Sequence, residues 1–401
     1  MDSATTQIID PYGDLLVLLP TAKTKLQISS KVLSTASPVF RSMFSPRFRE
    51  GAALASATKL TEIEFPDDSP QALGIIFDVL HFRHDCVSDD YSHDVLYNIA
   101  LVADKYDLTR ALGPWKEVWL KRGAGDGGRG LFVMYVFGDM EGFREGCRKA
   151  VIQSRGEEYD EYCESGDEDG EGDEGGGGEG EGGGGKGEGE GGGGKGEGEG
   201  GGGKGEGEGE EKGENGWACD ALPVQIVELL YGSRMVIIQS LLSVTAHFRD
   251  LYQSPTVKCK TFKSSGLFST PSSQVLTCDV AILGSLIRHE VDIGIFPTPS
   301  MPYRGISVEE LAVMMKGLRC FVDFAAGHGE CTITGQVIKM VDEVLASVDR
   351  LDVWDSAGGA DAVEGRRRGR DSRFMLADKE GVGGSLAVKR NIEPPWSKFR
   401  R

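Results

Sequence analysis

The stretch Asp14-Leu-Leu-Val-Leu-Leu-Pro20 decides how the fold begins. A continuous apolar run of this length that ends at proline is typical of a buried β-strand. Residues 26–28 alternate apolar and polar side chains, which predicts a second strand that pairs with the first as a hairpin through residues 21–23. Ile63 and Phe65 predict a third strand. Residues 1–10 read as a short polar lead.

Helices are expected to follow these strands. Serine precedes proline at Ser37-Pro38 and again at Ser69-Pro70. A serine can cap the first amide groups of a helix, and proline is well suited to the first helical position. Apolar residues then recur at helical spacing as far as residue 155. A few short strands followed by helices predict an α+β fold in which the strands pack on a helical bundle.

Glycine and charge are concentrated in one tract of the 401-residue chain. Of the 58 glycines, 29 lie between Ser165 and Gly216. The segment Glu157–Glu214 holds 22 acidic residues and 4 lysines, which leaves 40 basic and 41 acidic residues elsewhere. The net charge of −19 is therefore a property of this tract, which has almost no apolar side chain to bury and predicts a disordered linker. Nucleic acid binding is not expected of the near-neutral remainder.

Several motifs of the first block are similar to those of BTB/POZ domains. They are Asp14-Leu-Leu-Val17 and Ser30-Lys-Val-Leu-Ser-Thr-Ala-Ser-Pro-Val-Phe-Arg-Ser-Met-Phe44. Phe65-Pro-Asp-Asp68 and Leu101-Val-Ala-Asp-Lys-Tyr-Asp107 resemble the filamentous-fungal form of the domain. Tyr135-Val-Phe-Gly-Asp139 resembles the helical extension that such proteins carry.

Composition and periodicity, together with the resemblance of the first block, predict a division of the chain into five parts. A BTB/POZ-like domain would span residues 11–122 and its helical extension residues 123–155. The acidic linker would occupy residues 156–216, a mainly helical C-terminal module residues 217–348, and a disordered basic tail residues 349–401. The linker is expected to let the C-terminal module move independently of the first block.

The resemblance also implies protein–protein interaction, either with a second copy of the chain or with another protein. In related domains the acid that corresponds to Asp14 lies near the dimer interface. The expected interaction residues are this acid, the apolar first strand and the helix after Ser37, namely Asp14, Leu15, Val17, Phe40, Met43 and Phe44. The alternative for Asp14 is that it only starts the strand and bonds to nearby backbone.

The second block predicts a small helical module. Apolar residues at helical spacing run for nearly thirty residues after Pro223, and a second helix is expected over Val280–Ile287. Ser307 and Glu310 are spaced as a capping box that starts a third helix. A fourth is expected around Val341.

A candidate metal site lies in the same block. Cys259, Cys278, His328 and Cys331 supply three sulfurs and one imidazole, a ligand set that tetrahedral zinc accepts. His328 and Cys331 are closely spaced on a turn, whereas the other two cysteines lie 19 residues apart. The alternative is a set of separate thiols, with Cys278 buried beside its helix and His328 exposed. A structural zinc is the only cofactor that the sequence suggests.

The sequence favours an interaction or scaffold protein over an enzyme. No histidine lies in an H-E-x-x-H motif and no serine lies in G-x-S-x-G. Two alternatives stay open: a substrate adaptor for a cullin-type ubiquitin ligase, as the resemblance implies for some relatives, and a nuclear regulator that uses the basic tail around Arg366. The expected partners are proteins, without a membrane, nucleic acid or small-molecule substrate, in the cytoplasm, the nucleus or both.

Overall fold

The structure is a computed structural model. It describes residues 5–57, 59–157, 217, 221–261, 273–320 and 327–350. Residues 158–216, which make up most of the predicted linker, lie outside the described residues, and so does the predicted tail after Arg350. Trp217, directly after the linker, is described.

The N-terminal part contains a mixed four-stranded sheet. Its strands are β1 (Thr5–Ile8), β2 (Leu15–Leu19), β3 (Thr24–Ile28) and β4 (Thr61–Glu64), in the order β1-β3-β2-β4. The predicted hairpin is confirmed, because β2 and β3 are antiparallel and pair Leu15 with Ile28. β1 runs parallel to β3 and β4 runs parallel to β2. Together with the helices, this sheet confirms the α+β class.

The expectation of a polar lead over residues 1–10 is wrong in part. Thr5–Ile8 forms the edge strand β1, although all four of its residues are exposed. The strand is held by backbone pairing with β3, in a register that sets Thr5 opposite Thr24. It has no buried face, so it lacks the alternation of apolar and polar side chains by which a strand is read from sequence.

Eight helices complete the N-terminal part. They are α1 (Ser30–Ala36), α2 (Pro38–Met43), α3 (Arg49–Ser56), α4 (Pro70–Leu80), α5 (His93–Lys105), α6 (Gly113–Leu120), α7 (Gly127–Phe137) and α8 (Met140–Gln153). The predicted caps are confirmed: Ser37 accepts a hydrogen bond from the Phe40 amide, and Ser69 accepts one from Ala72. The two helices begin at prolines 38 and 70 as predicted, because proline needs no amide partner in the first turn.

An aromatic cluster joins the sheet to the helices. The Phe40 ring stacks on Tyr106 with centroids 4.4 Å apart, and Phe65 meets the edge of both rings. The Tyr106 hydroxyl donates a 2.6 Å hydrogen bond to the carboxylate of Asp68. The cluster thus buries large apolar area while the one polar group in it keeps a partner.

The C-terminal part is helical. Its helices are α10 (Val224–Gln253), α11 (Ser273–Asp292), α12 (Val308–Lys316) and α13 (Thr334–Leu345). The thirty-residue helix and the Ser307–Glu310 capping box are confirmed. The helix expected over Val280–Ile287 is longer than predicted and forms the middle of α11.

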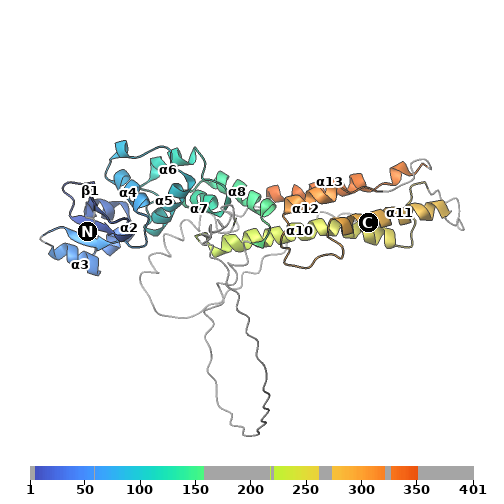
Figure 1. Cartoon of the computed structure of the whole chain (residues 1–401), viewed down its shortest axis with the longest axis horizontal. Coiled ribbons are helices and arrows are strands. Elements are labelled where there is room, and N and C mark those ends of the chain that lie inside the picture. Colours follow the sequence, from blue (N-terminus) through green and yellow to red (C-terminus); the bar gives the residue numbers. More distant parts are fainter. Residues whose placement is uncertain are drawn as a thin grey trace, which may run out of the picture.

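The two parts pack against each other, which contradicts the expectation that the C-terminal module moves independently. α8 contacts both α10 and α12, and one continuous apolar core runs from the sheet into the C-terminal helices. Figure 1 shows the sheet and the first helices at one end, α7 and α8 in the middle, and α10 to α13 as an elongated arm.

The long helix α10 is apolar enough, by length and mean hydropathy, to cross a membrane. Its buried side chains pack against α8, α11, α12 and α13. Packing against four other helices accounts for much of its apolar composition, with 44% of its most apolar stretch buried.

Candidate metal centre

The four predicted ligands come together at one end of the C-terminal helices. Cys259 follows the end of α10, and Cys278 lies in the second turn of α11. His328 and Cys331 are the first and last residues of the 3-10 helix η4 (His328–Cys331). The ligand atoms of all four residues lie within 4.8 Å of one another, and all four side chains are buried.

The distances suit a tetrahedral ion. The Sγ atoms of Cys259 and Cys331 are 3.8 Å apart, and the Nδ1 atom of His328 lies 3.2 Å from the first and 3.8 Å from the second. Zinc bond lengths of about 2.3 Å to sulfur and about 2.0 Å to nitrogen, at tetrahedral angles, imply sulfur–sulfur distances of about 3.8 Å and sulfur–nitrogen distances of about 3.5 Å. The buried Cys3His cluster can therefore hold a metal ion.

Two observations describe the environment of the cluster. The Oγ1 atom of Thr261 lies 3.0 Å from the Sγ atom of Cys259. The carboxylate of Asp279, next to Cys278 in the chain, accepts a 2.8 Å hydrogen bond from the amide of Lys258, next to Cys259. This bond ties the segment after α10 to α11 and so helps to fix the two cysteines beside each other.

The thiols of the cluster titrate differently. Burial raises the pKa of Cys259, but hydrogen bonds with Thr261, Cys278 and Cys331 outweigh it and bring the pKa down to about 7. Burial raises the pKa of Cys278, and so do its hydrogen bonds with the other two cysteines. Of these two cysteines, Cys259 therefore gives up its proton more readily. A divalent cation would displace the remaining thiol protons and neutralise the charge of the thiolates.

The alternative interpretation of these residues fails for His328. Its side chain is only 5% exposed and its Nδ1 atom faces the sulfurs, whereas the alternative placed it on an exposed turn. Gly327, at φ +80°, gives the backbone the left-handed turn that carries the histidine into the core. Cys278 lies within α11 and is 6% exposed.

The predicted interaction residues are placed partly in the core and partly on the surface. Leu15, Val17 and Phe40 are fully buried within the chain, so they are not available to a partner in this fold. Met43 and Phe44 are half-buried. Asp14 is exposed, and its carboxylate accepts hydrogen bonds of 2.8 and 2.7 Å from the amide and hydroxyl of Ser30. Asp14 thus caps the start of α1, a helix that begins sixteen residues further along the chain.

A groove of about 710 Å³ lies on the N-terminal part, a site that sequence reasoning missed. It runs between α1, the end of α4 and α6, and residues such as Val32, Leu80 and Val118 make it largely apolar. Phe82 stands at its rim with 82% of its side chain exposed and φ +60°. A bulky residue in the left-handed region is rare, and backbone strain of this kind concentrates at functional sites.

Near Phe82, three ring side chains that line the groove contact one another in a row. The indole nitrogen of Trp115 donates a 3.1 Å hydrogen bond to the Nδ1 atom of His84, and the two rings are 5.7 Å apart. Phe82 meets the edge of the His84 ring. Trp115 and Phe82 therefore flank one histidine, and their apolar faces border the groove.

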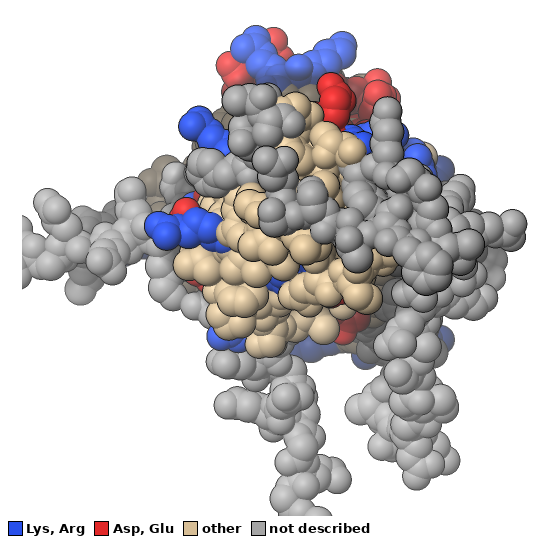
Figure 2. All heavy atoms as spheres, turned by 90° about the vertical axis from the view of Figure 1, so that its right-hand side faces the viewer, with Lys and Arg blue, Asp and Glu red and all other residues tan. Residues whose placement is uncertain are grey.

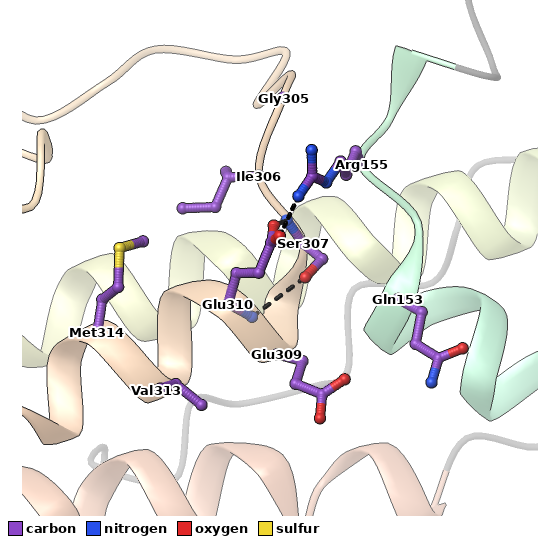
Figure 3. Close-up of a pocket in the computed structure, with 9 residues that line it drawn as sticks. All are labelled: Gln153, Arg155, Gly305, Ile306, Ser307, Glu309, Glu310, Val313 and Met314. Atoms are coloured by element: carbon purple, nitrogen blue, oxygen red, sulfur yellow. Dashed lines mark hydrogen bonds and ion pairs between the residues drawn. The ribbon is translucent and has the colours of Figure 1, made fainter.

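A second hollow of about 670 Å³ lies where α8 meets α12. Figure 3 shows Arg155 reaching from the segment after α8 toward Glu310 on α12, with which it forms an ion pair. The Oε2 atom of Glu310 also accepts a hydrogen bond from the Ser307 amide, while the Ser307 hydroxyl accepts one from the Glu310 amide. Two of the charged residues that line this hollow, Arg155 and Glu310, thus help to hold the two parts together.

Arg234 is a second residue that the sequence analysis missed. It lies in α10 with 0% of its side chain exposed. Its guanidinium is within 3.0 Å of four backbone carbonyl oxygens, two in the segment after α8 and two in the segment before α12, those of Ser154, Arg155, Tyr303 and Ile306. The signal was present, because arginine at a core position of an apolar helix requires buried partners.

Comparisons of the chain with protein-family models, with curated proteins and with solved structures find no match. The metal cluster, the groove and the Arg234 contacts are therefore interpreted from their own geometry.

Proposed function

We propose that this chain is a non-enzymatic interaction scaffold, that its N-terminal α+β part is a BTB/POZ domain, and that zinc stabilises its C-terminal helices. The protein would act inside the cell, in the cytoplasm or the nucleus. The motif resemblance supports the domain assignment. The apolar groove beside Phe82 is the observation that carries the interaction role.

The groove supports a protein partner for two reasons. Its walls are mainly aliphatic and aromatic, and its volume of about 710 Å³ leaves room for an apolar side chain of a partner. An exposed aromatic side chain at the rim of an apolar groove is the kind of residue that anchors an interface, since aromatic residues dominate binding energy. The expected partner inserts an apolar side chain into the groove beside Phe82.

The test compares partner binding by the full chain and by Phe82→Lys. Proteins that remain bound to each form at equal loading would be quantified by mass spectrometry. A partner that contacts the groove should be retained at least about tenfold less by the variant, because a lysine at the rim of an apolar interface lowers affinity by more than about 1.4 kcal/mol.

Tyr12→Lys is the matched control, because Tyr12 is an aromatic side chain of the same part, 96% exposed, that does not line the groove. A cullin lost only from Phe82→Lys supports an adaptor, and chromatin proteins lost in the same way support a nuclear regulator. If no bound protein distinguishes Phe82→Lys from Tyr12→Lys, the groove is not a docking site and the proposal is wrong.

Zinc is the ion that the metal cluster favours. Three thiolates and one imidazole form a soft donor set, which suits Zn²⁺ better than Mg²⁺ or Ca²⁺. Four protein ligands leave no open position for a water or substrate, as in structural rather than catalytic sites. Elemental analysis of the full chain should find one zinc per molecule, and Cys278→Ser should lower this value while Cys86→Ser, at an exposed free cysteine, should not.

A further inference from the structure

The helix α11 carries two apolar faces, and only one of them is used within the chain. Cys278, Ile282 and Leu286 are buried on the face that packs toward α10 and the metal cluster. A second row of apolar side chains lies at helical spacing on another face. We call it the outer stripe, and its members are Leu276, Val280, Leu283, Ile287 and Val291.

The outer stripe is open to solvent along the helix. Val280 is 69% exposed, Val291 50% and Leu276 49%, and the two residues between them are partly exposed. A helix on the surface of a single folded chain normally needs one apolar stripe. A second stripe that stays uncovered indicates a surface for a further partner.

The surroundings of the stripe are low in charge. None of its five members is charged, and the exposed charges of α11 that lie closest, Arg288 and Asp292, pair with each other. Figure 2 views the molecule from the end where α11 lies, and uncharged residues make up most of the coloured surface at its centre, with most Lys, Arg, Asp and Glu around it. A surface without charge is compatible with self-pairing, in which any charge near the symmetry axis would meet its own copy.

We propose that the outer stripe pairs with the outer stripe of a second copy of this chain, with the two α11 helices antiparallel. In the register that centres the pair between Leu283 and Gly284, Leu276 faces Val291 of the second copy and Val280 faces its Ile287. Each contact then occurs twice, as a two-fold interface requires.

Shape supports this register at its centre. Leu283 of one copy lies against Gly284 of the other, and reciprocally. Gly284 is exposed, and a Cβ atom at that position would have no heavy atom within 4 Å. The backbone at Gly284 thus offers a shallow space for the leucine and allows the two helices to approach closely.

The expected area predicts a weak dimer. Fifteen residues of helix are about 22 Å long, and a contact as wide as one helix, about 12 Å, buries about 500 Å² in total on the two copies. Stable interfaces bury about 1,200–2,000 Å², so the dimer should form reversibly at micromolar concentrations or above. This surface is separate from the groove beside Phe82, and the proposal does not depend on that groove.

The test is sedimentation velocity of the full chain between about 1 and 200 μM, compared with Gly284→Leu. The variant leaves the folded monomer intact or more stable, because the site is open and leucine favours helix over glycine by about 0.7 kcal/mol or more. In the dimer the new side chain collides with Leu283 of the second copy. The dissociation constant should rise at least about tenfold.

Gly232→Leu is the matched control. Gly232 lies in α10, is exposed and likewise has no heavy atom within 4 Å of an added Cβ, so the same substitution gains the same helix propensity away from the stripe. Its dissociation constant should equal that of the unchanged protein. A chain that stays monomeric at 200 μM overturns the proposal, and so does a dimer that Gly284→Leu leaves as tight as before, since it would form through another surface.

Discussion

The N-terminal and C-terminal parts of the molecule differ in how their cores are connected along the chain. In the N-terminal part, several packed elements are neighbours in sequence, such as β2 with β3, α4 with α5 and α7 with α8, while β2 also pairs with the more distant β4 and α5 packs against α7. In the C-terminal part, the four ligands of the metal cluster lie in the segment after α10, in α11 and in η4, which are spread along the chain from Cys259 to Cys331. Arg234 also joins segments about 80 and 70 residues away from it.

This difference indicates where each part is vulnerable. Contacts between neighbours close short loops at a low entropy cost, and the hydrophobic core holds them once formed. The C-terminal contacts close longer loops around a few polar side chains, and each of those side chains leaves buried groups unsatisfied when it is removed. Single substitutions at the cluster or at Arg234 should therefore have larger effects than the loss of any one local contact.

The largest effect is expected from loss of the metal cluster. Cys278→Ser, or a strong chelator, should destabilise the C-terminal helices by more than about 3 kcal/mol, since structural zinc contributes its binding free energy to folding. Hydrogen exchange followed by mass spectrometry would show lost protection in α11 and η4, while β2 and β3 stay protected. Cys86→Ser should leave both parts unchanged. If α11 and η4 were equally protected in Cys278→Ser and in Cys86→Ser, the C-terminal helices would be stable without a bound ion.

A somewhat smaller effect is expected at Arg234, where the two parts meet. Arg234→Met keeps the length of the side chain but removes the donors to four carbonyl oxygens. Each buried oxygen that is left without a donor lowers the unfolding free energy by about 1–3 kcal/mol. Because water can reach some of these oxygens and replace the missing donor, we expect the unfolding free energy to fall by about 3 kcal/mol in total. Urea unfolding should then show two transitions in place of one.

Arg288→Met is the control for that substitution, because Arg288 is an arginine of a neighbouring helix with 75% of its side chain exposed. Its unfolding free energy should change by less than about 0.5 kcal/mol. Unchanged stability of Arg234→Met would show that the contacts of Arg234 follow from the packing of α8 on α10 and do not maintain it.

The smallest effect is expected at the start of α12 and depends on pH. Hydrogen bonding to the Ser307 amide and to Arg155 lowers the pKa of Glu310. A carboxyl whose folded pKa is lowered adds stability above its unfolded pKa, near 4.3, and loses it as the pH falls through the folded value. Amide exchange at the first turn of α12, corrected for its intrinsic pH dependence, should increase a few-fold on acidification from pH 5 to pH 2.

Glu310→Gln should show little of that pH dependence, whereas Glu309→Gln, at the neighbouring acid of the same turn, should retain it. The same acidification should leave the first turn of α2 unchanged, because its cap is the uncharged hydroxyl of Ser37. Equal pH dependence in Glu310→Gln and in the unchanged protein would assign the effect to another carboxylate.

The local elements could be predicted from the sequence to a large extent. The hairpin, the caps at Ser37 and Ser69 and the Ser307–Glu310 capping box depend on residues a few positions apart, so the pattern contains all the partners. The edge strand β1 could not be predicted, because it is held mainly by backbone hydrogen bonds with a strand that lies 19 residues further along the chain.

The candidate sites divide in the same way. The sequence by itself determined the residue types of the metal cluster and the close spacing of His328 and Cys331. Only the tertiary structure decided that Cys259 and Cys278 reach the same point, that Phe40 belongs to the core rather than to an interaction surface, and that the outer stripe of α11 stays open. The physical reason is that a residue's chemistry and its local hydrogen bonds belong to a short segment, whereas convergence and exposure depend on which faces of distant helices the whole core covers.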